Sequence, residues 1–353
     1  MMRLILKYIV CGILFCILNA CEHPDITLQN PNDLLRPAAE FAHNNFQFSL
    51  FYAAIERAGL IDELNAKGPL TVFAPADAAF HEMGIRSRSD LDRIGVDSLK
   101  YLVRLHIIKG LLYREDVPTG TLDNKYISTA GAELWLANQT SYSGIYINGA
   151  TATNAKTNIR LSNGVFHEID KILKSNNTTL QSWLEKQENF SILVAGFKKF
   201  GLWEQLANNT QWTILAPDNA AFEKHGITKA KIEEMVAAKY SKRLFGAYIF
   251  PVRFFTTDIY FFPRAGTYED YPLGMASIRM PIGVDNTFSH GINGDMYTPE
   301  EFFVIESLPA DKKAPYRSLN FNQYPSRSDY LSKNGVVHQI EDLIFLPEET
   351  LNH

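Results

Sequence analysis

The sequence predicts an α+β fold that is built twice. The first observation is an internal repeat, because the ten residues from Thr71 to Phe80 return 142 positions later, from Thr213 to Phe222. The second is that each copy opens with apolar residues at helical spacing and closes with a strand-like run. The third is length: 353 residues, 46% hydrophobic and 21% charged, suffice for two globular domains.

Further motifs repeat in the same order. The pairs at the same spacing of 142 are Phe48–Phe51 with Phe190–Leu193, His106 with Tyr248, and Asp116 with Asp258. The closing motif Asn163–Asp170 returns as Asn334–Glu341, now 171 positions later. The second copy therefore contains 29 extra residues before its closing motif.

The first part of each copy is predicted to be helical and then to form a short strand. Phe48, Phe51 and Ile55 recur at helical spacing, and Gly59 is expected to mark the end of that helix. Thr71–Phe73 is rich in β-forming residues, and Pro75 is expected to stop this run from extending as a central strand.

The next signals are a helix start and a final turn. Asp77 is predicted to be a helix N-cap, as is Asp218 or Asn219 in the second copy. The Asn-Gly pairs at 163–164 and 334–335 predict tight turns that favour positive φ. The residues that follow each pair are expected to form the final strand, at Val165–Ile172 and Val336–Leu346.

The N-terminus indicates a lipoprotein leader. Arg3 and Lys7 precede a short apolar run that ends in Leu-Asn-Ala-Cys at residue 21, which resembles a bacterial lipobox. Residues 1–20 are therefore predicted to be a signal peptide and Cys21 to carry lipid, which gives a stable anchor only when two or three chains are attached. The alternative is that Cys21 is an ordinary residue after a conventional signal peptide.

The chain beyond Cys21 divides into a tether and two domains. Residues 21–43 contain three prolines and are predicted to be a tether, although Leu34-Leu35 and Ala38–Phe41 could form a short helix that docks on the first domain. The domains are predicted at 44–174 and 183–348. The polar connector between them, at about 175–183, is expected to allow some relative motion.

Composition and motifs argue against several functions. The net charge of −5 disfavours nucleic acid as a partner. No catalytic motif, metal site or cofactor site is found: His81-Glu82, for example, lacks the second histidine of a zinc protease, because residue 85 is Ile. An enzyme is therefore not expected. A hydrolase hidden in the insertion would have to use the dense polar group Asp285, His290, Asp295, Glu300 and Glu301.

The repeated histidines and aspartates have a structural and a functional interpretation. His167 and His338 are interpreted as hydrogen-bonded structural residues on a strand, with a site histidine as the alternative. His106 is interpreted in the same way, with a binding surface as its alternative. Asp116 and Asp258 are interpreted as turn or cap residues rather than ligands.

An aromatic-rich segment in the second copy is the candidate binding region. Of the 86 residues from 245 to 330, 18 are Phe or Tyr. Phe254-Phe255 and Phe302–Ile305 are predicted to be buried strands, and an enlarged sheet could use the remaining aromatics as core. Tyrosines on loops would instead offer flat faces with a polar tip for sugars or protein partners. The candidate binding residues are His106, Tyr248, Tyr316, Arg317, Tyr324, Arg327 and Tyr330.

The repeated motifs resemble those of the fasciclin domain. The phrases T-V-F-A-P-A-D-A-A-F and N-G-V-F-H-E-I-D look like its two signature boxes. The resemblance implies two tandem domains, each a wedge-shaped twisted β-sandwich with packed helices, and an extracellular role in adhesion without enzymatic activity. The chain departs from the family at the Tyr-His pair, which is Leu105-His106 in the first copy and Ala247-Tyr248 in the second.

The function predicted from these features is adhesion or ligand binding at the cell envelope. The protein is expected to be anchored through Cys21 in the outer membrane or on the surface of a Gram-negative bacterium, without a cofactor. Its partner would be an extracellular protein or a glycan. The alternative is a glycan-binding accessory lipoprotein of an outer-membrane polysaccharide uptake system. The sequence leaves open the ligand, the membrane leaflet and the oligomeric state.

Overall fold

The computed structural model describes residues 35–139, 144–207, 211–261, 275–282, 288–295, 302–307, 317–319 and 327–352. Cys21, the predicted signal peptide and most of the predicted tether lie outside these residues, as do Tyr316 and Tyr324. Arg317 is described only as the first residue of a strand. Among the described residues, no helix is long and apolar enough to cross a membrane.

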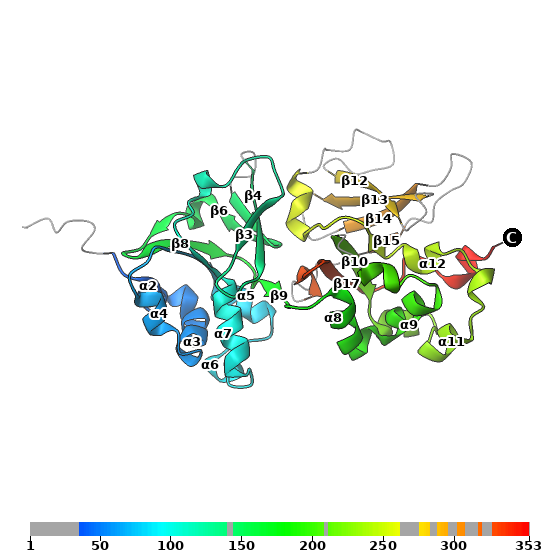
Figure 1. The fold of residues 1–353 in the computed structure, drawn as a ribbon, viewed down its shortest axis with the longest axis horizontal. Coiled ribbons are helices and arrows are strands. Elements are labelled where there is room, and N and C mark those ends of the chain that lie inside the picture. The colour runs from blue at the N-terminus through cyan, green and yellow to red at the C-terminus, as the bar shows by residue number, and fades with distance from the viewer. Residues whose placement is uncertain are drawn as a thin grey trace, which may run out of the picture. The chain divides into compact units, whose positions relative to one another are not determined.

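The first repeat begins with helices that gather on one side of its sheets (Figure 1). They are α2 (Ala38–Asn44), α3 (Ser49–Arg57), α4 (Ile61–Asn65), α5 (Asp77–Glu82), α6 (Arg88–Leu91) and α7 (Val96–Leu105). The amphipathic helix predicted from the sequence is confirmed as α3: Phe51 and Ile55 on its inner face are fully buried. Gly59 follows the end of α3 with a φ of 68°, a conformation that glycine adopts without strain.

Two sheets follow in the first repeat. Their strands are β1 (Leu70–Pro75), β2 (Ile107–Lys109), β3 (Asn124–Ile127), β4 (Glu133–Gln139), β5 (Gly144–Ile147), β6 (Ala150–Thr153), β7 (Ile159–Arg160) and β8 (Gly164–Ile169). One sheet has the order β2-β1-β8-β7, with β1 parallel to β8. The other has the order β3-β4-β5-β6 and is antiparallel throughout.

Strand β1 is central and shows how the layers pack. Leu70 and Val72 belong to an apolar cluster shared with the helices, whereas Phe73 belongs to a cluster shared with Leu134 and Ile145 of the other sheet. Because successive side chains of a strand point to opposite faces, the β1 sheet lies between the helices and the second sheet. The predicted sandwich with helices packed over one side is therefore confirmed. The strand includes Pro75 as its last residue and is central up to that point.

The second repeat has the same plan. Its helices are α8 (Leu180–Lys186), α9 (Ser191–Lys199), α10 (Asn219–Glu223), α11 (Lys229–Glu234) and α12 (Arg243–Gly246). Its strands are β10 (Trp212–Pro217), β11 (Ile249–Phe250), β12 (Met275–Ile282), β13 (Phe288–Asp295), β14 (Phe302–Ser307), β15 (Arg317–Leu319), β16 (Tyr330–Ser332) and β17 (Gly335–Ile340). One sheet has the order β11-β10-β17-β16-β9, where β9 is Lys174–Ser175, and the other has the order β12-β13-β14-β15. The strand predicted at Phe302–Ile305 is confirmed, whereas Phe254 and Phe255 are buried outside any strand.

Each repeat begins earlier than its sequence motifs indicate. The N–H of Ala38 donates to Oδ1 of Asn163 (3.1 Å), and the N–H of Leu180, 142 positions later, donates to Oδ1 of Asn334 (2.9 Å). The first helix of each repeat, α2 or α8, is thus held by the asparagine of the closing motif. The predicted docking helix at the end of the tether is confirmed as α2, whose alanines are buried.

The glycine after each of these asparagines is needed for close packing. A Cβ at Gly164 would lie 2.1 Å from the carbonyl oxygen of Leu70, and one at Gly335 would lie 2.1 Å from that of Trp212. The Asn-Gly pair at 163–164 predicts a turn with positive φ at Gly164. Close approach between the parallel strands explains the residue instead, because any side chain would separate β1 from β8.

The predicted N-cap at Asp77 is wrong, and the second repeat shows why. Asp77 lies inside α5, and its carboxylate accepts the N–H of Leu50 (2.8 Å), which ties α5 to α3. Asn219 does the same for Ile192 in the second repeat (3.0 Å). The N-cap lies one residue earlier: Asp218 accepts the N–H of Ala221 (2.8 Å).

The connector between the repeats is bonded to the second repeat. Strand β9 pairs in parallel with β16, and the N–H of Asn176 donates to the carbonyl of Leu331 (2.9 Å). The side chain of Asn176 also contacts Ser332 (2.9 Å), and helix α8 begins only a few residues later. These contacts limit the motion that the polar sequence of the connector predicted. Both repeats belong to one compact unit, residues 36–353.

Candidate functional site

A threonine and a histidine on neighbouring strands form a buried polar pair in the first repeat. The hydroxyl of Thr71 donates to the carbonyl of Gly110 (2.8 Å) and accepts the N–H of Leu112 (2.9 Å). Nδ1 of His167 accepts the N–H of Asn158 (3.3 Å), so Nε2 donates to the carbonyl of Leu112 (2.9 Å). Burial lowers the pKa of His167 to about 4, which keeps the ring neutral at pH 7.

The second repeat reproduces this pair. Thr213 donates to the carbonyl of Val252 (2.7 Å) and accepts the N–H of Phe254 (3.0 Å). Nδ1 of His338 accepts the N–H of Asp329 (3.1 Å), and Nε2 donates to the carbonyl of Phe254 (3.1 Å). The interpretation of His167 and His338 as structural histidines on a strand is therefore confirmed.

His106 and Tyr248 also have the same structural role, because each accepts a backbone N–H, although one uses an imidazole nitrogen and the other a hydroxyl. Nε2 of His106 accepts the N–H of Leu173 (3.0 Å), and the hydroxyl of Tyr248 accepts the N–H of Ile344 (3.0 Å), which is the equivalent residue. Both side chains are at most 1% exposed. Both are candidate binding residues by sequence, but their burial and backbone partners place them in the core.

The repeated aspartates are turn residues, as the sequence predicted. Asp116 accepts the N–H of Tyr113 (2.8 Å), and Asp258 accepts the N–H of Phe255 (2.8 Å). They differ in environment, because Asp258 is only 6% exposed. Burial raises the pKa of Asp258 to about 7, against the opposing effects of the Phe255 N–H and the Arg253 charge.

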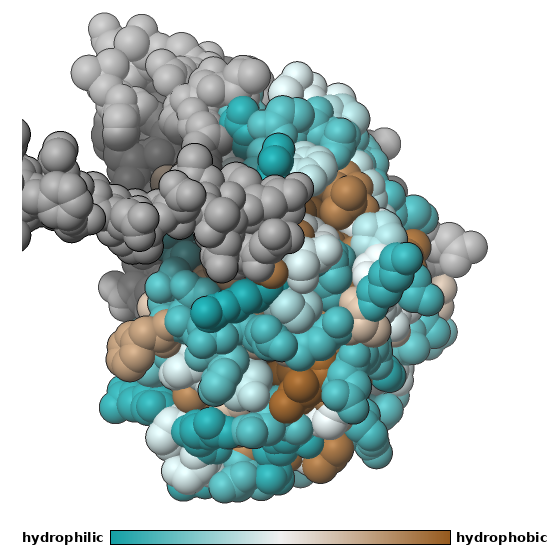
Figure 2. Space-filling view, turned by 90° about the vertical axis from the view of Figure 1, so that its left-hand side faces the viewer, coloured by the Kyte–Doolittle hydropathy of each residue, from teal (hydrophilic) through white to brown (hydrophobic). Residues whose placement is uncertain are grey.

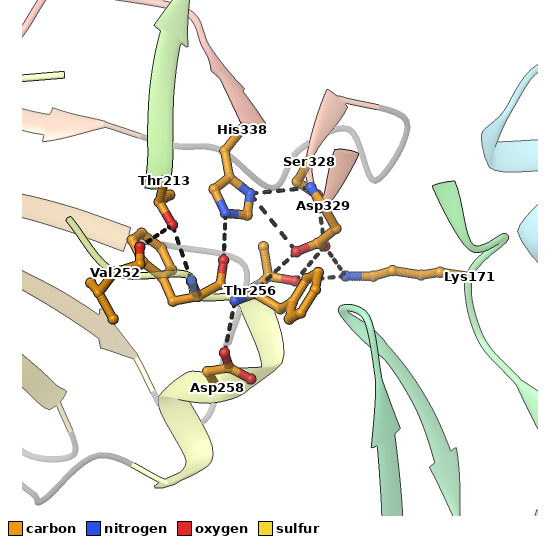
Figure 3. A network of polar contacts seen from close by, with 10 residues as sticks. Lys171, Thr213, Val252, Thr256, Asp258, Ser328, Asp329 and His338 are labelled. Carbon is orange, nitrogen blue, oxygen red and sulfur yellow. Dashed lines mark hydrogen bonds and ion pairs between the residues drawn. The ribbon is translucent and has the colours of Figure 1, made fainter. Parts of the chain in front are cut away.

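A polar network centred on Asp329 connects the two repeats (Figure 3). Asp329 is 2% exposed, and its carboxylate accepts the N–H of Thr256 (2.8 Å) and the Thr256 hydroxyl (2.7 Å). Nζ of Lys171, from the first repeat, lies 3.9 Å from Asp329 and 3.3 Å from the Thr256 hydroxyl. The backbone of Gly149, also in the first repeat, approaches so closely that a Cβ there would lie 2.2 Å from Cγ of Asp329.

Charge keeps Asp329 ionised within this network. Burial alone would favour the neutral acid, but the positive charges of Lys171 and Lys174 hold the pKa of Asp329 below its usual value. Burial in turn lowers the pKa of Lys174 to about 8, and its ammonium group lies 5.1 Å from the ring centre of Tyr330. The network is therefore a buried set of opposite charges whose members depend on one another.

Arg253 makes a second polar contact between the repeats. Its guanidinium lies 3.4 Å from the ring centre of Trp135 and 2.8 Å from the carboxylate of Asp123, both in the first repeat. Sequence reasoning missed Arg253, Trp135, Lys171 and Asp329 as functional residues. One signal for Asp329 was present in the sequence: it stands 171 positions after Asn158, so the second repeat has an acid where the first has an amide.

The remaining candidate binding residues lie apart from this network or outside the described residues. Arg327 pairs with Glu341 (2.9 Å) on a partly exposed surface. Tyr330 packs against Trp183 with 5.2 Å between ring centres. Tyr316 and Tyr324 lie outside the described residues, as do Asp285, Glu300 and Glu301 of the hydrolase alternative. Within the described part of the chain, no three His, Cys, Asp or Glu side chains are placed to hold a metal ion.

The described surface also carries grooves of ligand size. One of about 630 Å³ lies beside α9, where Lys198 pairs with Glu185 (2.7 Å) and Lys199 donates to the carbonyl of Glu233 (2.7 Å). Another, of about 420 Å³, lies between the end of α4 and β2. On the face drawn in Figure 2, hydrophilic residues predominate among the coloured atoms, and hydrophobic ones form small separate patches.

Known proteins share sequence similarity with this chain. Residues 46–175 match the family model described as Fasciclin domain. Periostin of Homo sapiens is 24% identical over 295 residues, which cover 82% of this chain and 30% of periostin. Protein sll1483 of a Synechocystis species is 30% identical over 153 residues, which cover 43% of this chain and 81% of that protein.

A solved structure is also similar. It is a FAS1 domain pair from the insect cell adhesion molecule fasciclin I, with a TM-score of 0.40 and 18% sequence identity, covering 86% of this chain and 99% of that one. The present chain spans less than a third of the length of periostin.

Proposed function

Since the chain belongs to the fasciclin-domain family, we propose that it is a non-enzymatic adhesion or ligand-binding protein of the cell envelope. In this proposal the two repeats act as tandem domains that present grooves and loops to an extracellular partner. Lipid on Cys21 holds the protein at the outer membrane of a Gram-negative bacterium, and the residues up to about 35 act as the tether.

The proposal rests on one observation: the polar side chains that both repeats share form hydrogen bonds with the backbone of the fold. The side chains that could do chemistry and that both repeats share bind backbone groups of the fold: His167 and His338, Asp116 and Asp258, and Asn163 and Asn334. A catalytic site needs such groups within reach of a substrate. The repeat thus supports a scaffold whose variable parts bind a partner.

The glycan-binding alternative rests on the aromatic-rich insertion. Tyrosines on loops present flat amphipathic surfaces suited to sugar rings. Tyr316 and Tyr324 remain the candidates for this role. Tyr330 is less suitable, because its ring packs against Trp183 and its face is covered by the ammonium group of Lys174.

A binding screen tests both forms of the proposal. Residues 22–353 would be applied to a glycan array and, in parallel, to a panel of extracellular matrix proteins. Saturable binding to one protein supports adhesion, whereas sugar binding that disappears in the Tyr316→Ala/Tyr324→Ala variant supports the glycan alternative. Tyr330 is kept unchanged, because its substitution would also remove packing against Trp183 and a loss of binding could then result from a disturbed fold. Absence of binding in both screens contradicts the proposal.

The anchor is tested separately. The full chain and its Cys21→Ser variant would be expressed with a labelled fatty acid and fractionated. Incorporation of the label and association with the membrane are expected for the unaltered chain and not for the Cys21→Ser variant. Equal membrane association of both proteins would contradict lipid anchoring through Cys21.

A further inference from the structure

The groove beside α4 is a small apolar hollow with a basic rim. Its floor is formed by Leu64, Leu70 and Ile107, which are 1%, 9% and 4% exposed. The exposed side chains of Lys67 and Lys109 line the same groove. Its volume of about 420 Å³ lies within the range of small-molecule sites, about 300–1,000 Å³.

The positive charge of this groove is not balanced from within. Glu63 also lines it, but its carboxylate accepts a hydrogen bond from Arg104 (2.6 Å). Neither the ammonium group of Lys67 nor that of Lys109 forms a hydrogen bond or ion pair with any residue in the described part of the chain. Two cationic groups are therefore free to bind an anion beside an apolar floor. The groove next to α9 differs, because two of its three lysines, Lys198 and Lys199, already have partners.

The second repeat shows that the fold does not require these features. At the position of Leu70 it has Trp212, a larger residue that is 8% exposed. In place of Lys67 and Lys109 it has Asn209 and Pro251. The scaffold is therefore built in the second repeat without the two lysines and with a bulkier side chain at the floor.

From these contacts we infer that the groove of the first repeat binds an amphiphilic carboxylate. The apolar part of the ligand lies over Leu64, Leu70 and Ile107, and its carboxylate lies between the ammonium groups of Lys67 and Lys109. A medium-chain fatty acid has this chemistry. The groove belongs to the first repeat alone, because all the residues that line it lie between Glu63 and Thr129.

Calorimetric titration of residues 22–353 with dodecanoate, below its micelle concentration and near neutral pH, tests the inference. Saturable binding of one equivalent is expected. The Lys67→Gln/Lys109→Gln variant should bind at least tenfold more weakly. Leu70→Trp, which copies the second repeat, should abolish binding by filling the floor. The matched control is Lys186→Gln/Lys239→Gln, which removes two lysines elsewhere and should bind as the unaltered protein does.

Charge and fold are controlled within the same experiment. Dodecyltrimethylammonium has a similar chain with the opposite charge and should bind at least tenfold more weakly than dodecanoate. Thermal unfolding of each variant checks that the fold persists. The inference is overturned if dodecanoate does not bind saturably, if both probes bind equally, or if the folded Lys67/Lys109 and Leu70 variants bind as the unaltered protein does.

Discussion

Asn158 in the first repeat and Asp329 in the second occupy the same place in the fold. Each has a left-handed backbone, with φ of 59° and 61°, and each donates its N–H to a histidine Nδ1. Oδ1 of Asn158 accepts the N–H of Arg114 (2.8 Å), and Oδ1 of Asp329 accepts the N–H of the equivalent residue, Thr256 (2.8 Å).

The two residues differ in what lies beyond these shared bonds. The amide of Asn158 reaches Glu115 (2.8 Å) at a partly exposed surface. The second oxygen of Asp329 is covered by the first repeat and faces Lys171. Replacing an amide by an acid at one repeated position thus turns a local turn residue into a buried contact between repeats. The scaffold is thus duplicated, whereas the contact made by Asp329 is specific to the second copy.

Removing Asp329 should have the largest effect. Asp329→Ala leaves the Thr256 N–H without its acceptor and Lys171 without its ion-pair partner, and loss of one partner of a buried charge pair costs about 3–5 kcal/mol. Denaturant unfolding should show this loss. The control is Arg327→Ala, which breaks a partly exposed pair with Glu341 and should cost less than about 1 kcal/mol. Equal effects of the two variants would contradict a special role for Asp329.

Acid should destabilise the first repeat more than the second. Burial lowers the pKa of His106 from 6.5 to about 4, so the unfolded chain binds the proton first. Stability is therefore lost as the pH falls from 6.5 towards 4, by about 3 kcal/mol. The second repeat has Tyr248 in place of this histidine, and its Asp258, with the pKa raised to about 7, favours the folded state as the pH falls.

Hydrogen exchange at pH 7 and pH 4.5 can resolve this difference between the repeats. The variant Leu105→Ala/His106→Tyr copies Ala247-Tyr248 and should make the first repeat less sensitive to acid. A parallel loss of protection in both repeats, or no change in the variant, would show that His106 does not set the difference.

Packing between α9 and α12 should be sensitive to one methyl group. A Cβ at Gly196 would lie 1.9 Å from the ring of Phe245, so Gly196→Ala should destabilise the protein by about 1–3 kcal/mol. The first repeat has Ala54 and Val103 at the same positions. Adding Phe245→Val should therefore recover part of the loss, and a double-mutant cycle of unfolding free energies measures that coupling. Additive effects would mean that the two positions do not contact each other.

The smallest effect is expected at the start of α5. Ala76 is an N-cap without a side-chain bond, whereas the equivalent Asp218 caps α10. Ala76→Asn should stabilise the first repeat by about 0.5–1 kcal/mol. Ala76→Asp should gain less, because Glu168 stands where the second repeat has Gln339, which donates to Asp218 (2.7 Å). Thermal unfolding of both variants checks this order.

Much of the scaffold can be predicted from the sequence, because the same motifs in the two repeats form the same strands. The spacing of 142 located β1 and β10, and the closing motif located β8 and β17. Helices α2 and α8 were harder to assign, since they share a position but few residues. Asp77 is not the N-cap that its sequence context predicts, because its partner, the N–H of Leu50, lies on another helix. Contacts between elements depend on which faces meet, and residue spacing along the chain does not specify this.

The candidate site was less predictable for the same reason. The sequence identified His106 and Tyr248 as a repeated pair but could not show that both accept a backbone N–H in the core. Lys171 and Arg253 look like ordinary surface charges in the sequence. Their partners Asp329 and Trp135 lie in the other repeat, over 100 residues away.

The pairing of β9 with β16 affects how the chain can be divided. Lys174 and Ser175, where the first repeat meets the connector, cover the edge of the sheet of the second repeat. A fragment that begins at residue 176, inside the polar connector, would leave β16 as an open edge available to pair with another molecule. A fragment that begins before Lys174 would retain its own edge strand, and should therefore stay monomeric at concentrations where the shorter one associates.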